Sequence, residues 1–217
     1  MQTTKLTING YRGEPVPNHF HRQDADTDHL ALVLPGFGYS CDMPLLYFTV
    51  NHLLDGGTDV LQVEYQYNER QDYRTLEPHE RQRWLQEDVS AAWQAALAQR
   101  KYQRFTVIGK SLGTRAMPTL ISTEPLLKEA CTIWFTPMWQ EASVAAWLRR
   151  STQPTLVVIG TADPLYTETL AEEIAANEHC TVTVLPDVDH SLEIPGKIIR
   201  SVQSLEHALI AVQGFTA

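Results

Sequence analysis

Residues 105–113 read FTVIGKSLG, a short apolar run that leads directly into a glycine-rich turn around one serine. The run FTVI has the composition of a buried strand. The next five residues place Ser111 in the pattern G-x-S-x-G, in which the serine lies on a sharp, strained turn between a strand and a helix. We therefore expect the Ser111 hydroxyl to lie above the carboxyl edge of a sheet. The alternative is an ordinary glycine-rich turn.

Apolar runs alternate with amphipathic stretches on both sides of this turn. Strands are predicted at 30–34, 59–65, 105–108, 131–135, 155–159 and 181–185. Helices are predicted at 43–54, 79–100, 112–121, 140–150, 168–177 and 197–212. This alternation predicts an α/β fold, with a mostly parallel central sheet and helices on both faces. Asp42 is a candidate N-cap of the first helix, and Pro118 should shorten or kink the helix that contains it.

The first residues follow another pattern. TKLTI at 4–8, the turn pair Asn9-Gly10 and the stretch 11–22 predict an antiparallel hairpin on an edge of the sheet. Pro15 and Pro17 suit an edge position. Because the sequence contains no repeat, low-complexity tract or linker, we predict a single domain over residues 1–217.

Composition excludes several classes of function. The 217 residues include 26 acidic and 17 basic side chains, a net charge of −9, which disfavours nucleic acid and anionic membrane surfaces as partners. The three cysteines show no CxxC spacing, so neither a disulfide framework nor a zinc site is indicated. No stretch has the length and apolarity of a signal peptide or membrane span. We expect a cytoplasmic protein.

A serine nucleophile needs a base within hydrogen-bond reach and a third group that orients the base. After such a turn the expected chain order is serine, then an acid, then histidine. Asp163 follows the apolar run TLVVIG, and His190 follows the run TVTVLP. The sequence therefore predicts Ser111, Asp163 and His190 as a catalytic triad. Asp187 and Asp189 are rival acids, interpreted as turn formers because they lie so close to His190.

Two N–H groups should stabilise the oxyanion of an acyl-transfer intermediate. One belongs to Leu112, the residue after the nucleophile. The other comes from the turn after the strand at 30–34, where the Phe37 N–H is the best candidate and Gly38 and Tyr39 are the next ones. Glycine at Gly36 and Gly38 lets the backbone approach a substrate closely. The same residues also suit a plain turn that leads into a helix.

At these residues the chain resembles the α/β-hydrolase superfamily. The resemblance covers about residues 28–210 and rests on LVLPGFGYS (32–40), VIGKSLGT (107–114), VVIGTADPLY (157–166) and PDVDHSLE (186–193). It is similar to the small, capless dienelactone hydrolase-like members. This implies esterase-type chemistry on a small substrate, without cofactor or metal. Two departures are Pro35 where the family often has histidine, and Ser111 where dienelactone hydrolases have cysteine.

Residues 136–154 leave no room for a large cap between two predicted strands. Met138 and Trp139 could therefore wall a substrate pocket, or simply pack on the neighbouring helix. The polar segment 66–80 could reach the substrate or form a solvated surface loop. We expect Lys110, unusual inside the turn, to pair with an acid such as Glu64.

Together these features predict a serine hydrolase that acts on a small carboxylic ester, of esterase or thioesterase type, through an acyl-enzyme. An acyltransferase or perhydrolase would use the same triad, and a hydrolase fold used only for binding is the remaining alternative. The expected partner is a small ester-like molecule, and a homodimer is possible.

Overall fold

The computed structural model describes residues 1–216, and these residues contain one eight-stranded sheet in the order β1-β2-β4-β3-β5-β6-β7-β8. From β4 to β8 all neighbouring strands run parallel, which confirms the predicted mostly parallel sheet. The strands are β1 (Gln2–Thr4), β2 (Asn18–Arg22), β3 (His29–Leu34), β4 (Asp59–Val63), β5 (Arg104–Lys110), β6 (Cys131–Phe135), β7 (Thr155–Gly160) and β8 (Cys180–Leu185).

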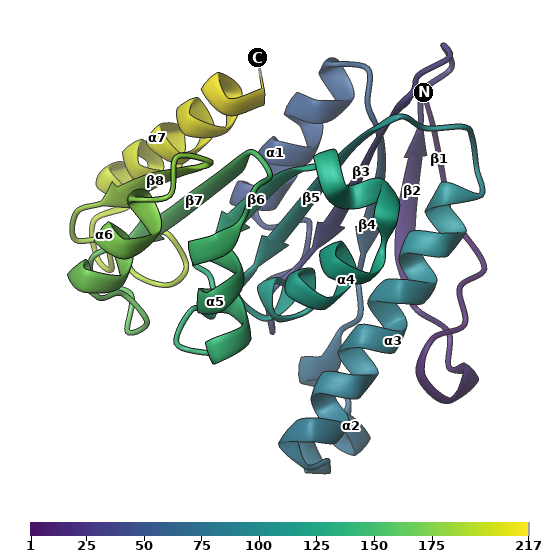
Figure 1. The fold of residues 1–217 in the computed structure, drawn as a ribbon, viewed down its shortest axis with the longest axis horizontal. Coiled ribbons are helices and arrows are strands. Elements are labelled where there is room, and N and C mark those ends of the chain that lie inside the picture. Colours follow the sequence, from purple (N-terminus) through teal and green to yellow (C-terminus); the bar gives the residue numbers. More distant parts are fainter. Residues whose placement is uncertain (217) are drawn as a thin grey trace.

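Helices cover both faces of the sheet, as Figure 1 shows, with α3 to α6 in front and α1 and α7 behind. They are α1 (Pro44–Asp55), α2 (Gln71–Thr75), α3 (Pro78–Leu97), α4 (Met117–Thr123), α5 (Ala142–Arg150), α6 (Glu168–Ala175) and α7 (Ile198–Thr216). The strand β3 is buried on both faces: Leu30, Leu32 and Leu34 join the front core, whereas Ala31 and Val33 join the rear core. This explains its continuous apolar sequence.

The register of the parallel strands brings several loops to one edge. Leu34 aligns with Gly109, Lys110 with Phe135, and Gly160 with Leu185. Because these pairs lie at the carboxyl ends of their strands, the loops that follow open at the same edge. Within residues 1–216 the connection from β6 to β7 holds α5 as its one helix, so the fold carries no large cap there.

The N-terminal edge is antiparallel, as predicted, but its turn lies elsewhere. β1 pairs with β2, and β2 pairs with β4, both in antiparallel register. Asn9 faces Pro15 across an isolated bridge, so the Asn9-Gly10 pair enters a longer loop instead of forming a two-residue turn. The loop is extended because Tyr11 is buried: its N–H donates to Asp88 Oδ1 at 2.8 Å and its ring stacks on Trp84.

Two helix starts differ from the prediction. The helix α1 begins at Pro44 with Met43 at the N-cap position, so Asp42 as N-cap was wrong; proline favours the first helical position and sets the start there. The predicted helix at 112–121 is divided into a 3₁₀ segment, Ser111–Arg115, and α4. Pro118 lies in the first turn of α4, where its missing N–H costs no hydrogen bond.

The segment 66–80 is solvated over most of its length, but Tyr67 and Tyr73 are buried. It contains a 3₁₀ turn, Tyr67–Glu69, and the short helix α2. The rings of Tyr65, Tyr67 and Tyr73 are buried and stack in series, with centroid distances of 4.6 and 4.1 Å. The rings of Tyr67 and Tyr73 also contact Trp84 of α3 edge-on, and this burial holds the segment to the body of the protein.

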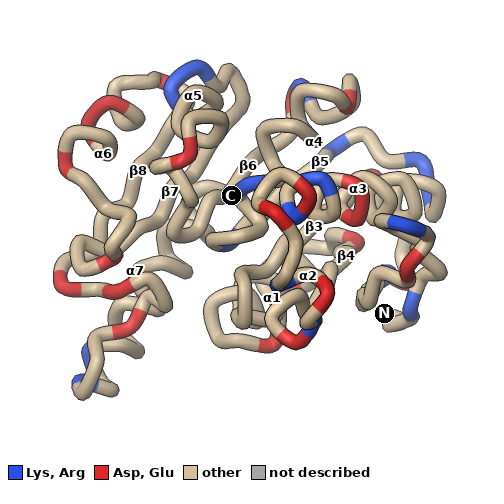
Figure 2. The backbone as a smooth tube through the Cα atoms, turned by 90° about the horizontal axis from the view of Figure 1, so that it is seen from below, with Lys and Arg blue, Asp and Glu red and all other residues tan. Residues whose placement is uncertain are grey.

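Charged residues of both signs are found along α3, whereas α6 carries only acidic ones, as the tube in Figure 2 shows. Within residues 1–216, none of the helices combines the length and apolarity that crossing a membrane requires.

Candidate active site

Ser111 lies at the sharp bend between β5 and the 3₁₀ segment that follows. Its backbone φ is +47°, a left-handed conformation that is strained for any residue with a Cβ atom. Gly113 makes the bend possible, because a Cβ atom there would collide with the carbonyl oxygen of Leu34 on the neighbouring strand. The sequence pattern thus produces a tight turn with the serine at its apex.

Two loops from distant parts of the chain bring an imidazole and a carboxylate to this serine. The Nε2 atom of His190 lies 2.7 Å from Ser111 Oγ. The Nδ1 atom of His190 lies 2.7 Å from Asp163 Oδ2. An ionised carboxylate only accepts, so Nδ1–H donates to Asp163 and Nε2 is left to accept the serine hydrogen. The Asp163 side chain is fully buried, whereas that of His190 is 35% exposed.

The loops that carry Asp163 and His190 are tied to each other. The N–H groups of Thr161 and Ala162 donate to the carbonyl oxygens of Leu185 and Val188 at 2.8 and 2.9 Å. Gly160 permits this approach, because a Cβ atom there would collide with the Val188 carbonyl. Asp163 is held in turn by the Leu165 N–H, which donates to its Oδ1 atom at 2.8 Å.

The two rival acids have other partners. Asp189 Oδ1 accepts from the N–H groups of Ser191 and Glu193 at 2.8 and 3.0 Å, which makes it a turn-forming residue. Asp187 lies in the left-handed region and pairs with Arg200 at 3.1 Å. Neither of these carboxylates is directed at the imidazole of His190.

The turn after β3 lies beside Ser111. It is closed by Gly36 N–H to the Tyr39 carbonyl at 3.1 Å and by Tyr39 N–H to the Gly36 carbonyl at 3.4 Å. With Gly38 at φ +75°, this is the pattern of a type II turn. The N–H groups of Phe37 and Gly38, at its tip, have no backbone acceptor within residues 1–216, whereas that of Tyr39 is used inside the turn.

Leu112 carries the N–H group predicted as the second donor. It lies in the first turn of the 3₁₀ segment, where N–H groups have no acceptor within the helix. A Cβ atom placed on Gly36 would lie 3.5 Å from the Ser111 Cβ, so the turn after β3 packs directly against the serine. The structure thus brings both predicted donors, Phe37 and Leu112, to the neighbourhood of the same hydroxyl.

A cavity of about 350 Å³ adjoins this turn. Its lining includes Gly38, Tyr39, Glu64 and Asn68, so the segment after β4 reaches this cavity. Burial raises the pKa of the Glu64 carboxyl. The Tyr39 hydroxyl oxygen already accepts a hydrogen bond from the Leu45 N–H at 3.2 Å, which limits its use as an acceptor for a ligand.

Met138 and Trp139 have different environments. The sulfur of Met138 lies 3.9 Å from Ser111 Oγ, and its N–H donates to Thr114 Oγ1 at 3.0 Å. Trp139 is 1% exposed, belongs to the front core and donates Nε1–H to the Leu165 carbonyl. Met138 therefore lies at the serine, whereas Trp139 packs behind the Asp163 loop and presents no surface to a substrate.

The expected Lys110–Glu64 pair was wrong. Lys110 Nζ donates to the His190 carbonyl at 2.8 Å and to Thr136 Oγ1 at 3.0 Å. Glu64 Oε1 accepts from the Cys41 N–H instead. Sequence reasoning missed Thr136 altogether, since a threonine after an apolar strand gives no signal of such a contact.

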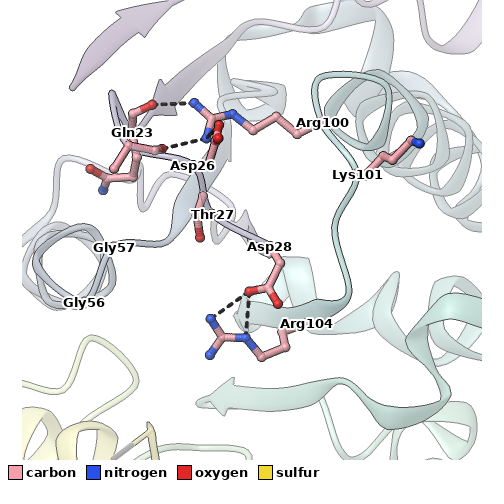
Figure 3. Close-up of a pocket in the computed structure, with 10 residues that line it drawn as sticks. Gln23, Asp26, Thr27, Asp28, Gly56, Gly57, Arg100, Lys101 and Arg104 are labelled. Carbon is pink, nitrogen blue, oxygen red and sulfur yellow. Dashed lines mark hydrogen bonds and ion pairs between the residues drawn. The ribbon is translucent and has the colours of Figure 1, made fainter.

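A larger cavity, of about 810 Å³, lies at the opposite edge of the sheet, at the amino ends of β3, β4 and β5 (Figure 3). Its two arginines have partners: Arg100 donates to the carbonyl oxygens of Gln23 and Ala25, and Arg104 pairs with Asp28. Within residues 1–216, no three His, Cys, Asp or Glu side chains gather as a metal site would require.

Comparison with known proteins assigns the family. The model of the alpha/beta hydrolase domain matches residues 28–216. This chain is an alpha/beta hydrolase. The matched region includes the serine turn, both loops of the imidazole–carboxylate pair and the turn after β3, and it confirms the resemblance seen in the sequence. No curated protein matches this alpha/beta hydrolase.

Several solved structures share the fold of this hydrolase. An α/β serine hydrolase without lid from Xanthomonas campestris is 19% identical, with a TM-score of 0.69 over 96% of this chain and 94% of its own. An α/β serine hydrolase homologue from Coxiella burnetii is 12% identical, with a TM-score of 0.73 over 99% and 98%. An esterase from Pyrococcus furiosus is 16% identical, with a TM-score of 0.67 over 94% and 91%.

Proposed function

We propose that this alpha/beta hydrolase is a serine esterase that cleaves a small carboxylic ester through an acyl-enzyme at Ser111. The observation that carries the proposal is the continuous chain from Ser111 Oγ to His190 Nε2 and from His190 Nδ1 to Asp163, with both contacts at 2.7 Å. A hydroxyl, a base and a buried carboxylate in this order are what nucleophilic acyl transfer requires.

In the proposed cycle His190 takes the proton of Ser111 as the hydroxyl oxygen attacks the ester carbonyl. The N–H groups of Phe37 and Leu112 stabilise the oxyanion, and Asp163 stabilises the imidazolium. His190 then gives its proton to the leaving alcohol. Water, activated by the same imidazole, releases the acid and restores the serine. One oxyanion donor contributes about 3 kcal/mol to lowering such a barrier.

The nature of the substrate follows from the surroundings of the serine. The absence of a large cap within residues 1–216 and the 35% exposure of the His190 side chain favour a small substrate that enters from solvent. The thioether of Met138 offers an apolar surface beside the nucleophile for an acyl group.

Labelling with a fluorophosphonate tests the proposal. Wild-type protein should gain one adduct, which peptide mapping places on Ser111, and Ser111→Ala should gain none. Turnover of p-nitrophenyl acetate should disappear in the same variant. Folded wild-type protein without an adduct would contradict the esterase proposal and favour a binding role. Product analysis with an added alcohol or peroxide acceptor then separates hydrolysis from acyl transfer.

A further inference from the structure

Lys110 is a buried cation that the proposed cycle does not use. Its side chain is 1% exposed, although it immediately precedes the nucleophile. Its ammonium nitrogen donates to the His190 carbonyl at 2.8 Å and to Thr136 Oγ1 at 3.0 Å. The same nitrogen lies 4.5 Å from the ring centroid of Tyr39, within the range of a cation–π contact.

These contacts join three separate loops of the active site. Tyr39 belongs to the turn after β3, Thr136 to the loop after β6, and His190 to the loop after β8. Thr136 has a φ of +42°, a left-handed conformation that the surrounding contacts must hold. One ammonium group thus contacts three loops: the turn proposed as the oxyanion site, the loop that carries Met138, and the loop that carries the imidazole.

Burial of an ammonium group is expensive, and a hydrophobic residue of the same size often gives equal or greater stability. Stability therefore does not account for a lysine at this position. The His190 loop, by contrast, needs support: Asp187 and Leu192, on either side of the histidine, both have a φ of +62°. A displacement of about 1 Å in a catalytic group can lower a rate about 100-fold.

We propose that Lys110 is a positioning residue, whose ammonium group holds the main chain of His190 so that the imidazole stays within reach of Ser111. This inference rests on the proposed function. Because Lys110 is buried, it does not touch a substrate, and its effect passes through the His190 carbonyl. Charge strengthens this bond, since a hydrogen bond from an ionised donor is about twice as strong as a neutral one.

The first test compares Lys110→Met with Lys101→Met, an exposed lysine at the other edge of the sheet. Lys110→Met should lower kcat for p-nitrophenyl acetate about 30- to 100-fold and leave KM within about threefold, because the imidazole moves while the substrate surface remains. Fluorophosphonate labelling of Ser111 should slow by a similar factor. Lys101→Met should match wild type in every measurement.

Thr136→Val provides a second variant that keeps the lysine, in case Lys110→Met fails to fold. Loss of one ammonium acceptor should lower kcat about 3- to 10-fold. The double variant should be no slower than Lys110→Met alone, since both changes remove the same support. Additive losses would contradict a shared role.

The pH profile distinguishes a charged support from simple packing. Burial lowers the pKa of Lys110 to about 8, an effect that Asp163 and Asp189 oppose. The other titratable residues in contact with it are His190, through its carbonyl, and Tyr39, whose phenol pKa burial raises to about 12. Wild-type kcat/KM should therefore decline above about pH 8 as the ammonium loses its proton, and Lys110→Met should lack this decline.

Hydrogen exchange measures the support independently of activity. Deuterium uptake by a peptide spanning residues 186–194 should be faster in Lys110→Met than in wild type and Lys101→Met. Unchanged uptake together with kcat within twofold of wild type would overturn the positioning role. Failure of the esterase proposal would look different, because wild type itself would then give no Ser111 adduct while the exchange difference persisted.

Discussion

Tyr65 donates its hydroxyl hydrogen to the carbonyl oxygen of Pro35 at 2.7 Å, and both groups are buried. This bond links Tyr65, the second residue after β4, to the start of the turn that carries Phe37. The turn that we propose as an oxyanion site is thus held by the Tyr65 hydroxyl as well as by its own hydrogen bonds.

Tyr65→Phe should therefore loosen this turn. We expect a fall in kcat of about 3- to 10-fold and a loss of about 1 kcal/mol in the free energy of unfolding, since the Pro35 carbonyl loses its donor. Tyr67→Phe is the matched control: its hydroxyl donates to Asp88 at 2.6 Å, away from the serine. That variant should lose stability while kcat stays near wild type. Equal kinetic losses in both variants would contradict a specific role for Tyr65. Urea denaturation and steady-state kinetics provide both measurements.

The oxyanion assignment can be tested at one position. Proline suits the second residue of a type II turn, so Phe37→Pro should keep the turn but remove its N–H. We expect kcat to fall about 100-fold or more with little change in melting temperature. Phe37→Ala keeps the N–H and removes the exposed ring, so it should alter KM more than kcat. A fully active Phe37→Pro variant would assign the donor to Gly38 instead.

Substitution of each candidate acid tests whether Asp163 or Asp189 is the carboxylate of the triad. Asp163→Asn should lower kcat by about 10³- to 10⁴-fold, because an amide no longer holds the required tautomer of His190. Asp189→Asn should keep kcat within about threefold, although its turn loses charge-assisted hydrogen bonds and stability falls by about 1 kcal/mol. Kinetics on both variants, with melting curves as the check on folding, decide between them. The reverse ranking would move the carboxylate of the triad to Asp189.

Close packing at Gly113 gives a stability prediction. Gly113→Ala should cost more than about 2 kcal/mol, because the new methyl group meets the Leu34 carbonyl and the strands must separate. Gly214→Ala, in the last helix with open space around it, should stabilise by up to about 1 kcal/mol. Denaturant unfolding of the two variants measures the contrast. Similar stabilities would show that the bend tolerates a side chain at Gly113.

Acid sensitivity should depend on His29. Burial, helped by Arg104, lowers the pKa of His29 from 6.5 to about 4. Between pH 4 and pH 6.5 the unfolded chain binds more protons than the folded one. Stability that is present above pH 6.5 is therefore lost as the pH falls towards 4. After allowance for solvent screening the loss is about 1–2 kcal/mol. His29→Gln should flatten the stability curve between these pH values relative to wild type. Parallel curves for the two proteins would contradict the assignment.

Sequence patterns located most of the fold. Short runs rich in apolar residues predicted the parallel strands, and the burial of β3 on both faces agrees with LALVL, which has no polar position. Asp42 as N-cap failed for a local reason, the helix start at Pro44, whereas two other errors arose where side chains pack against distant residues. The N-terminal loop is longer than predicted because the Tyr11 N–H binds Asp88. The tyrosines between 65 and 73 are buried by stacking on one another, which the local polarity of the sequence does not reveal.

The sequence by itself determined the order of Ser111, Asp163 and His190 and their places after strands, because strand propensity and glycine turns act over a few neighbouring residues. Only the tertiary structure decided which groups are in contact. It determined the 2.7 Å contacts of His190, the burial of Trp139 in the core and the hydrogen-bond partners of Lys110. Such contacts depend on the register of strands far apart in the chain. A residue pattern does not reveal that register, so a buried ammonium bonded to the His190 carbonyl could be found only in three dimensions.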